Sequence, residues 1–151
     1  FRRVLFRSVY RLTGALHADD DMQGTPDGQG KTVRDSARRL ARMFGTDVED
    51  NPSLTVWRNA ACALASIQLL NIERALQTQL SRAQDVTGMP LGGAGVGSFL
   101  ARQLAQMHGM QYLDFSELCA APAQAGKQVA RAAAAVAVAQ LARMTHENPA
   151  G

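Results

Sequence analysis

Pro90–His108, PLGGAGVGSFLARQLAQMH, is the stretch of sequence on which the fold depends. Pro90 and Leu91 begin a short apolar strand, a glycine-rich turn follows, and apolar residues then recur at helical spacing. Ser98 is suited to cap the helix, because its hydroxyl can accept a hydrogen bond from an unpaired N–H of the first turn. The stretch therefore predicts a strand, a tight turn and a helix in immediate succession.

A second short strand is predicted at Gln111–Phe115, QYLDF. A strand, a helix and a strand within so short a span form a βαβ unit, which pairs its strands in parallel. Elsewhere the spacing of apolar residues predicts three helices, at Thr32–Phe44, from Pro52 to about Arg82, and at Lys127–Met144. The predicted fold class is α/β, rich in helix, with a small and mainly parallel sheet.

The glycines of the turn, Gly92, Gly93, Gly95 and Gly97, let the backbone adopt positive φ and approach a ligand or another strand closely. A helix that begins at such a turn presents N–H groups and its positive end to a phosphate or nucleotide. The dinucleotide fingerprint requires a third glycine where this chain has Ser98, so that motif is absent. The turn predicts either a phosphate-binding loop or a structural turn whose glycines serve helix packing alone.

The polar segment His17–Lys31, HADDDMQGTPDGQGK, is predicted to be a loop, and loops of this length in compact domains tend to be either functional or disordered. Thr25-Pro26-Asp27-Gly28 has proline at the second position of a β-turn. The run Asp19–Asp21 lacks the alternating spacing of a calcium loop and is interpreted as a solvated acidic turn. Gly30-Lys31 is similar to the end of a P-loop, but the first glycine of that motif is missing and no apolar strand precedes it.

The predicted helix Thr32–Phe44 is amphipathic. Its core-facing residues are Val33, Ala37, Leu40, Ala41 and Phe44. A row of arginines on the other side, Arg34, Arg38, Arg39 and Arg42, is interpreted as a solvated face, with contact to an anion as the alternative. The helix at Lys127–Met144 consists of Ala and Val on nearly every face, which predicts burial against a sheet. Its apolar part is too short to cross a bilayer.

The first eight residues, FRRVLFRS, are what the DNA TTC AGA CGT GTG CTC TTC CGA TCT encodes, and that DNA resembles the end of a common sequencing-library adapter. We interpret Phe1–Ser8 as a non-native leader; the alternative is the basic start of an amphipathic helix. Three of the 16 Lys and Arg residues lie there, which leaves 13 basic against 13 acidic residues. The balanced charge predicts no nucleic-acid or anionic-membrane partner.

Two cysteines, Cys62 and Cys119, lie in apolar helical surroundings. They are interpreted as small buried apolar residues in a reducing, cytoplasmic compartment rather than as a disulfide or a metal site.

The order of motifs along the chain resembles one protein family. Thr25–Lys31, TPDGQGK, is followed by a basic amphipathic helix, a long helix, a strand entering Gly93–Gly95, and a final Ala/Val helix. This order resembles the C-terminal half of the hydantoinase/oxoprolinase-like proteins of the ASKHA superfamily (actin, sugar kinases, heat-shock chaperones). It is most similar to the branch linked to tetrahydromethanopterin-dependent one-carbon transfer, whose archaeal relatives make methanofuran from an aminomethylfuran diphosphate and γ-glutamyltyramine. The resemblance covers residues 9–144, with 145–151 expected as a disordered tail.

The resemblance implies roles for two groups of residues. The strand-end residues would form the adenosine motif of an ASKHA fold and border a nucleotide or diphosphate site; they are Gly92, Gly93, Ala94 and Gly95. The TPDGQGK loop would enter the same cleft, with Gly28 and Gly30 at the ligand. Asp27 would then bind a metal such as Mg²⁺ or a substrate amine, and Lys31 a diphosphate, whose departure needs cationic stabilisation.

Three functions follow from the resemblance. The first is a transferase that condenses a diphosphate-activated aminomethylfuran with a tyramine-type acceptor. The second is a nucleotide-binding or scaffold protein of the same pathway without catalysis of its own, and the third is an ATP-dependent amidohydrolase like the hydantoinases. The phosphate-binding glycine hairpins of an ASKHA fold belong to its N-terminal half, and none is visible here. The chain alone is therefore expected to lack a complete active site and to be inactive.

Overall fold

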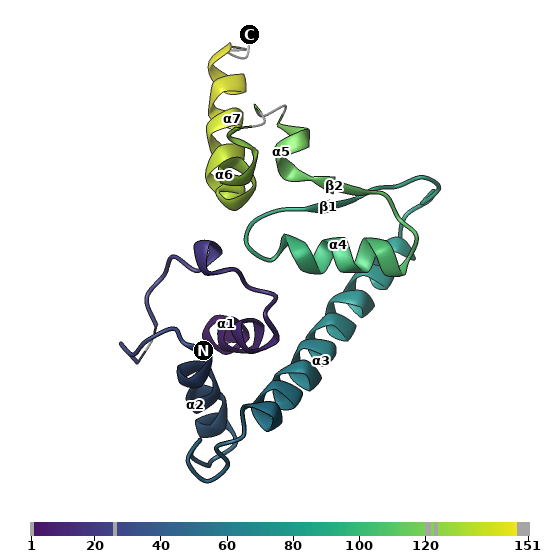
Figure 1. The fold of residues 1–151 in the computed structure, drawn as a ribbon. Coiled ribbons are helices and arrows are strands. Elements are labelled where there is room, and N and C mark those ends of the chain that lie inside the picture. The colour runs from purple at the N-terminus through teal and green to yellow at the C-terminus, as the bar shows by residue number, and fades with distance from the viewer. Residues whose placement is uncertain (1, 26, 120–121, 123, 148–151) are drawn as a thin grey trace. The chain divides into compact units, whose positions relative to one another are not determined.

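The computed structural model describes residues 2–25, 27–119, 122 and 124–147 (Figure 1). The chain divides into two units, Phe1–Ser81 and Arg82–Gly151. The described residues confirm a helix-rich protein with a small two-stranded parallel sheet. Each described helix is too short or too polar to span a lipid bilayer.

Among its described residues the first unit contains three α-helices, α1 (Arg2–Thr13), α2 (Val33–Met43) and α3 (Leu54–Leu80), which pack against one another. A short 3-10 helix, η1 (Ala18–Asp20), lies within the segment that was predicted to be a loop. Residues from α1, α2, the following turn and the start of α3 form one buried cluster: Val9, Leu12, Ala37, Leu40, Ala41, Val48, Trp57 and Ala61. Trp57 also donates a hydrogen bond from its indole N–H to the carbonyl of Asn51, at 2.7 Å. The apolar spacing thus predicted α2 and α3 correctly.

Two expectations about buried apolar residues of this unit are wrong. Phe44 is exposed, because it is the C-cap residue of α2 and its backbone departs from helical geometry, so that its side chain does not continue the apolar face of the helix. Cys62 is exposed on α3 rather than buried. Residues 2–8, most of the predicted leader, continue α1 toward the N-terminus.

In the second unit, β1 (Leu91–Gly93) and β2 (Tyr112–Asp114) pair in parallel with Gly93 opposite Asp114. The helix between them, α4 (Ser98–Met107), packs on both strands and buries Leu104 and Ala105. The βαβ prediction is therefore confirmed. The predicted cap is wrong, because Gly97 is the N-cap residue and Ser98 is already helical. The N–H of Ser98 bonds the carbonyl of Gly95 at 3.1 Å, inside the turn.

Three helices follow β2: α5 (Phe115–Leu118), α6 (Gly126–Arg131) and α7 (Ala133–Glu147). The single helix predicted at 127–144 is thus divided at Ala132. The carbonyl of Ala130, just before this break, accepts a hydrogen bond from the N–H of Gly95 at 2.8 Å instead of one from its own helix. The predicted burial of this helix against a sheet is also wrong, since Val138 is 67% exposed on α7. Of the predicted tail, residues 145–147 belong to α7 and residues 148–151 lie outside the described residues.

Candidate functional site

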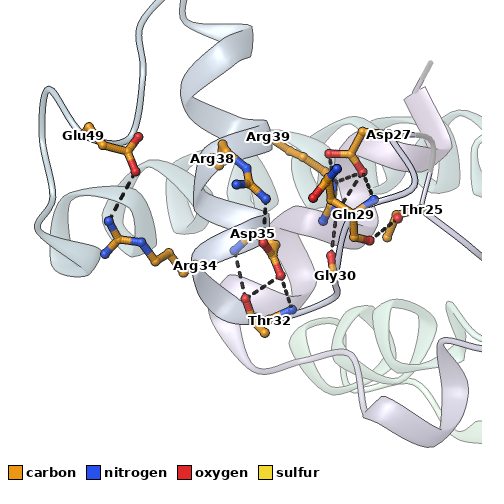
Figure 2. A network of polar contacts seen from close by, with 10 residues as sticks. All are labelled: Thr25, Asp27, Gln29, Gly30, Thr32, Arg34, Asp35, Arg38, Arg39 and Glu49. Carbon is orange, nitrogen blue, oxygen red and sulfur yellow. Dashed lines mark hydrogen bonds and ion pairs between the residues drawn. The ribbon is translucent and has the colours of Figure 1, made fainter.

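The TPDGQGK loop is held to α2 by an ion pair between Asp27 and Arg39 (Figure 2). Nε of Arg39 lies 3.0 Å from each carboxylate oxygen of Asp27, and Nη2 lies 2.9 Å from Oδ1. Nη2 also donates to the carbonyl of Gly30 at 2.5 Å. Arg39 thus bridges two points of the loop, and its side chain is only 9% exposed. The interpretation of this arginine as part of a solvated face is therefore wrong, whereas Arg34, which pairs with Glu49, is exposed.

The guanidinium of Arg39 holds the pKa of Asp27 at about 2, and the backbone N–H of Gln29 contributes in the same direction. Asp27 is therefore a carboxylate at neutral pH and cannot supply a proton. Gly28 closes the turn, because its N–H bonds the carbonyl of Thr25 at 3.2 Å and its φ is +64°. Pro26, predicted at the second position of this turn, lies outside the described residues.

Lys31 donates a hydrogen bond to the backbone carbonyl of Asp21. Asp21 is 4% exposed, and its carboxylate forms a close ion pair with Arg11 and a longer one, at 3.7 Å, with Arg7. The interpretation of residues 19–21 as a solvated acidic turn is wrong for Asp21. Its side chain instead anchors the loop to α1, since a buried carboxylate requires a cationic partner.

Gly30 is explained by the capping box at the start of α2. The hydroxyl of Thr32 accepts the N–H of Asp35 at 3.1 Å, and Oδ2 of Asp35 accepts the N–H of Thr32 at the same distance. A Cβ on residue 30 would lie 2.5 Å from that Oδ2. Glycine is therefore needed here to make room for a side chain of the same unit.

In the second unit, Gly93 lies against the ring of Tyr112. A Cβ on residue 93 would be 2.2 Å from the Tyr112 hydroxyl and 2.6 Å from Cε2. Aromatic side chains often cover a glycine on a neighbouring strand in this way. By contrast, a Cβ on Gly92 or Gly95 would meet nothing within 4 Å. Only Gly93 is thus required by close packing.

The turn between β1 and α4 uses its backbone groups within the unit. Gly95 has a φ of +71°, and its N–H is bonded to Ala130 on α6. Ala94 and Gly92 are exposed. The N–H of Leu100 bonds the carbonyl of Gly97 at 3.0 Å. The turn therefore offers a ligand fewer N–H groups than its glycine content suggested.

The strand pairing places Asp114, which the sequence analysis did not select, opposite Gly93 at the carboxyl end of the strands. Its Oδ1 accepts hydrogen bonds from the N–H and the hydroxyl of Ser116, at 3.0 and 2.6 Å. These bonds lower the pKa of Asp114, and the Tyr112 hydroxyl and the charge of Arg102 contribute in the same direction. The signal in the sequence was an acidic residue at the end of the second predicted strand.

The selected residues belong to two different units. Asp27, Gly28, Gly30 and Lys31 lie in one loop of the first unit, and residues 92–95 form one turn of the second. Ligands of open parallel sheets bind outside the carboxyl ends of the strands, which is where this turn lies. Within the described residues, no three acidic, histidine or cysteine side chains are grouped so that they could hold a metal ion.

The sequence matches no protein-family model, and no curated protein matches it. The resemblance to the ASKHA superfamily therefore stays a prediction.

Proposed function

We propose that the carboxyl end of the β1–β2 pair binds the phosphate groups of a nucleotide or of a diphosphate-bearing small molecule. The observation that carries the proposal is the register of the sheet, in which Gly93 lies opposite Asp114. This register brings the glycine turn, the first turn of α4 and one carboxylate to the same edge.

The chemistry of this edge suits a phosphate that is accompanied by a cation. The start of α4 contributes the positive end of a helix dipole. Asp114 is ionised at neutral pH, and its Oδ2 has only a long contact, 3.4 Å, to the Tyr112 hydroxyl. A single carboxylate together with substrate phosphates is a common ligand set for Mg²⁺, and Asp114 is the residue that would hold it.

We further propose, from the TPDGQGK resemblance, that the chain is part of a transferase that joins a diphosphate-activated aminomethylfuran to a tyramine-type acceptor. The ammonium group of Lys31 could stabilise the negative charge that develops on a departing diphosphate. In that role Lys31 would exchange its bond with the Asp21 carbonyl for one with the diphosphate.

A specific observation favours the non-catalytic alternative, a nucleotide-binding scaffold. Asp27 and Lys31 both have intramolecular partners that hold the loop in place. Charged side chains that are paired within the protein in this way stabilise its fold and are less accessible to a substrate. The two alternatives differ in whether Asp27 and Lys31 contribute anything beyond stability.

Binding is tested by titrating the isotope-labelled chain with ADP and Mg²⁺ and following backbone amide resonances. We expect shifts confined to Gly93–Phe99 and Asp114–Ser116, with a Kd of about 1 mM or weaker. This edge provides few charge-assisted hydrogen bonds to a phosphate, and the loss of translational and rotational freedom on association costs several kcal/mol. Adenosine with Mg²⁺ is the matched control, because it lacks phosphates. Equal shifts with adenosine, or none with ADP, would contradict the proposal.

The transferase and scaffold alternatives are separated by measuring condensation activity with Asp27→Asn and Lys31→Ala, each placed in the longer protein that the resemblance to a C-terminal half implies. Condensation activity should fall sharply in both variants at unchanged fold if the loop acts on substrate. Wild-type rates in both variants would remove the loop from the mechanism, whereas the absence of condensation activity in the unmutated protein would leave the scaffold alternative.

A further inference from the structure

Arg102 on α4 is an exposed arginine that lies over an aromatic ring. Its guanidinium carbon lies 4.1 Å from the centre of the Tyr112 ring, which is the geometry of a cation–π contact. Among the described residues, Arg102 donates no hydrogen bond and forms no ion pair within bonding distance. Its N–H groups are therefore available to a ligand.

Tyr112 also contacts the neighbouring strand. Its ring lies so close to Gly93 that a Cβ there would be 2.6 Å from Cε2, and its hydroxyl is 3.4 Å from Oδ2 of Asp114. A guanidinium stacked on an aromatic face keeps its N–H donors at the edge of the plane, pointing away from the ring. The stack thus restricts Arg102 while leaving its fork of donors exposed.

Asp114 belongs to the edge that carries the glycine turn, and Arg102 lies on α4, the helix that begins after this turn. Asp114 lies opposite Gly93 in the sheet, and the charge of Arg102 contributes to the low pKa of Asp114. A planar guanidinium binds two phosphoryl oxygens at once, with charge-assisted hydrogen bonds.

We infer that Arg102 binds the phosphoryl oxygens of a phosphate ester or diphosphate at this edge, and that Tyr112 is the positioning residue that holds its guanidinium. This inference rests on the proposed function and deepens it by naming the side chain that recognises the phosphate. The same chemistry would serve a nucleoside diphosphate or a diphosphate on another small molecule.

The test uses the complete chain with two probes, ADP and inorganic diphosphate, each with Mg²⁺. We expect Arg102→Lys to weaken the binding of both probes by about tenfold, because lysine keeps the charge but lacks the paired N–H donors of a guanidinium. Arg58 is an exposed arginine of α3, and Arg58→Lys is the matched control, which should leave the affinity for both probes unchanged. Tighter binding of ADP than of inorganic diphosphate would identify a nucleotide as the ligand, and equal binding a diphosphate.

Tyr112 is tested with a pair of variants. Tyr112→Leu removes the ring face and should weaken binding about threefold, whereas Tyr112→Phe keeps the ring and should retain the affinity that the leucine variant loses. The Arg102 Nε–H resonance should shift on adding either probe to the wild-type chain and to Tyr112→Phe. Amide spectra of each variant, recorded without ligand, report whether the second unit is folded.

The outcomes separate the two proposals. Wild-type binding that Arg102→Lys leaves unchanged, or that Arg58→Lys weakens equally, would overturn the role of Arg102 and leave the proposed function standing. A wild-type chain that binds neither probe would overturn both. Equal affinity in Tyr112→Leu and Tyr112→Phe would overturn the positioning role alone.

Discussion

Gly30 in the first unit and Gly93 in the second are both glycines of motifs that predicted a ligand, and both make room for a side chain of their own unit. At Gly30 that side chain is Asp35, and at Gly93 it is Tyr112. The difference lies in what holds the surroundings. The loop around Gly30 is held by ion pairs, of which Asp27 with Arg39 is the closest to it. The turn around Gly93 is held by one ring and by backbone hydrogen bonds.

This difference bears on function. In the loop, the charged side chains that could act on a substrate are already engaged, and a ligand would have to compete with them. At the turn, the ring of Tyr112 and backbone hydrogen bonds hold the structure, and the guanidinium of Arg102 lies over that ring with its N–H donors available to a ligand. One glycine of each motif is therefore explained by close packing, and in the second unit the neighbouring cation Arg102 contacts a ring rather than a carboxylate.

The largest expected effect comes from the buried anchor of the loop. Asp21→Ala leaves Arg11 without its partner and should lower the free energy of unfolding of the first unit by about 3 kcal/mol. Denaturant unfolding followed by the fluorescence of Trp57, which is buried in this unit, measures the loss. Asp19→Asn, at an exposed position, is the control and should cost almost nothing. A loss below about 1 kcal/mol would show that the loop is not held by this carboxylate.

The second effect tests the ring over Gly93. Gly93→Ala should destabilise the second unit by about 2 kcal/mol, because the new Cβ would overlap Tyr112. Gly92→Ala, where a Cβ meets nothing within 4 Å, is the matched control. Hydrogen exchange of the Leu91 amide, which bonds Gln111 across the strands at 2.7 Å, measures the change. Equal protection in both variants would mean that Tyr112 moves aside without cost.

The third effect is a pH dependence from the ion pair of Asp27. Its pKa is about 2 in the folded protein and 3.8 without its partners, so the folded state binds the proton less readily. The stabilisation is complete above about pH 4 and is lost as the pH falls through 2. We expect Asp27→Asn to cost about 1–2 kcal/mol at pH 6 and almost nothing near pH 2. A difference from wild type that does not shrink on acidification would contradict the assignment.

The smallest effect concerns the predicted leader. Arg7 lies 3.7 Å from Asp21 and is partly exposed, whereas Arg11 makes the close contact. Arg7→Ala should therefore cost less than about 0.5 kcal/mol, and Arg11→Ala several times as much, measured by Trp57 fluorescence. Equal losses would show that the leader contributes a specific contact to the fold, which an adapter-encoded segment has no reason to do.

The sequence by itself determined the local elements. The apolar spacing of residues 33–43 and 54–80 predicted α2 and α3, and the order of strand, glycine turn, helix and strand predicted the parallel pair. These features depend on neighbours within one or two turns or on the direction of one connection, so they can be read along the chain. Some glycine positions likewise marked where the backbone is crowded, as at Gly93, or turns sharply, as at Gly28 and Gly95.

The tertiary structure decided the partners of the charged and aromatic side chains. Asp21 is buried by Arg11, and Asp27 is engaged by Arg39, each about ten residues away along the chain but on another element. Helical and strand periodicity carries no information about such pairs. The division of the last helix at Ala132 was equally beyond periodicity, because the carbonyl of Ala130 is bonded to Gly95 in a distant turn. Asp114 entered the candidate site for the same reason, since only the strand register brings it opposite Gly93.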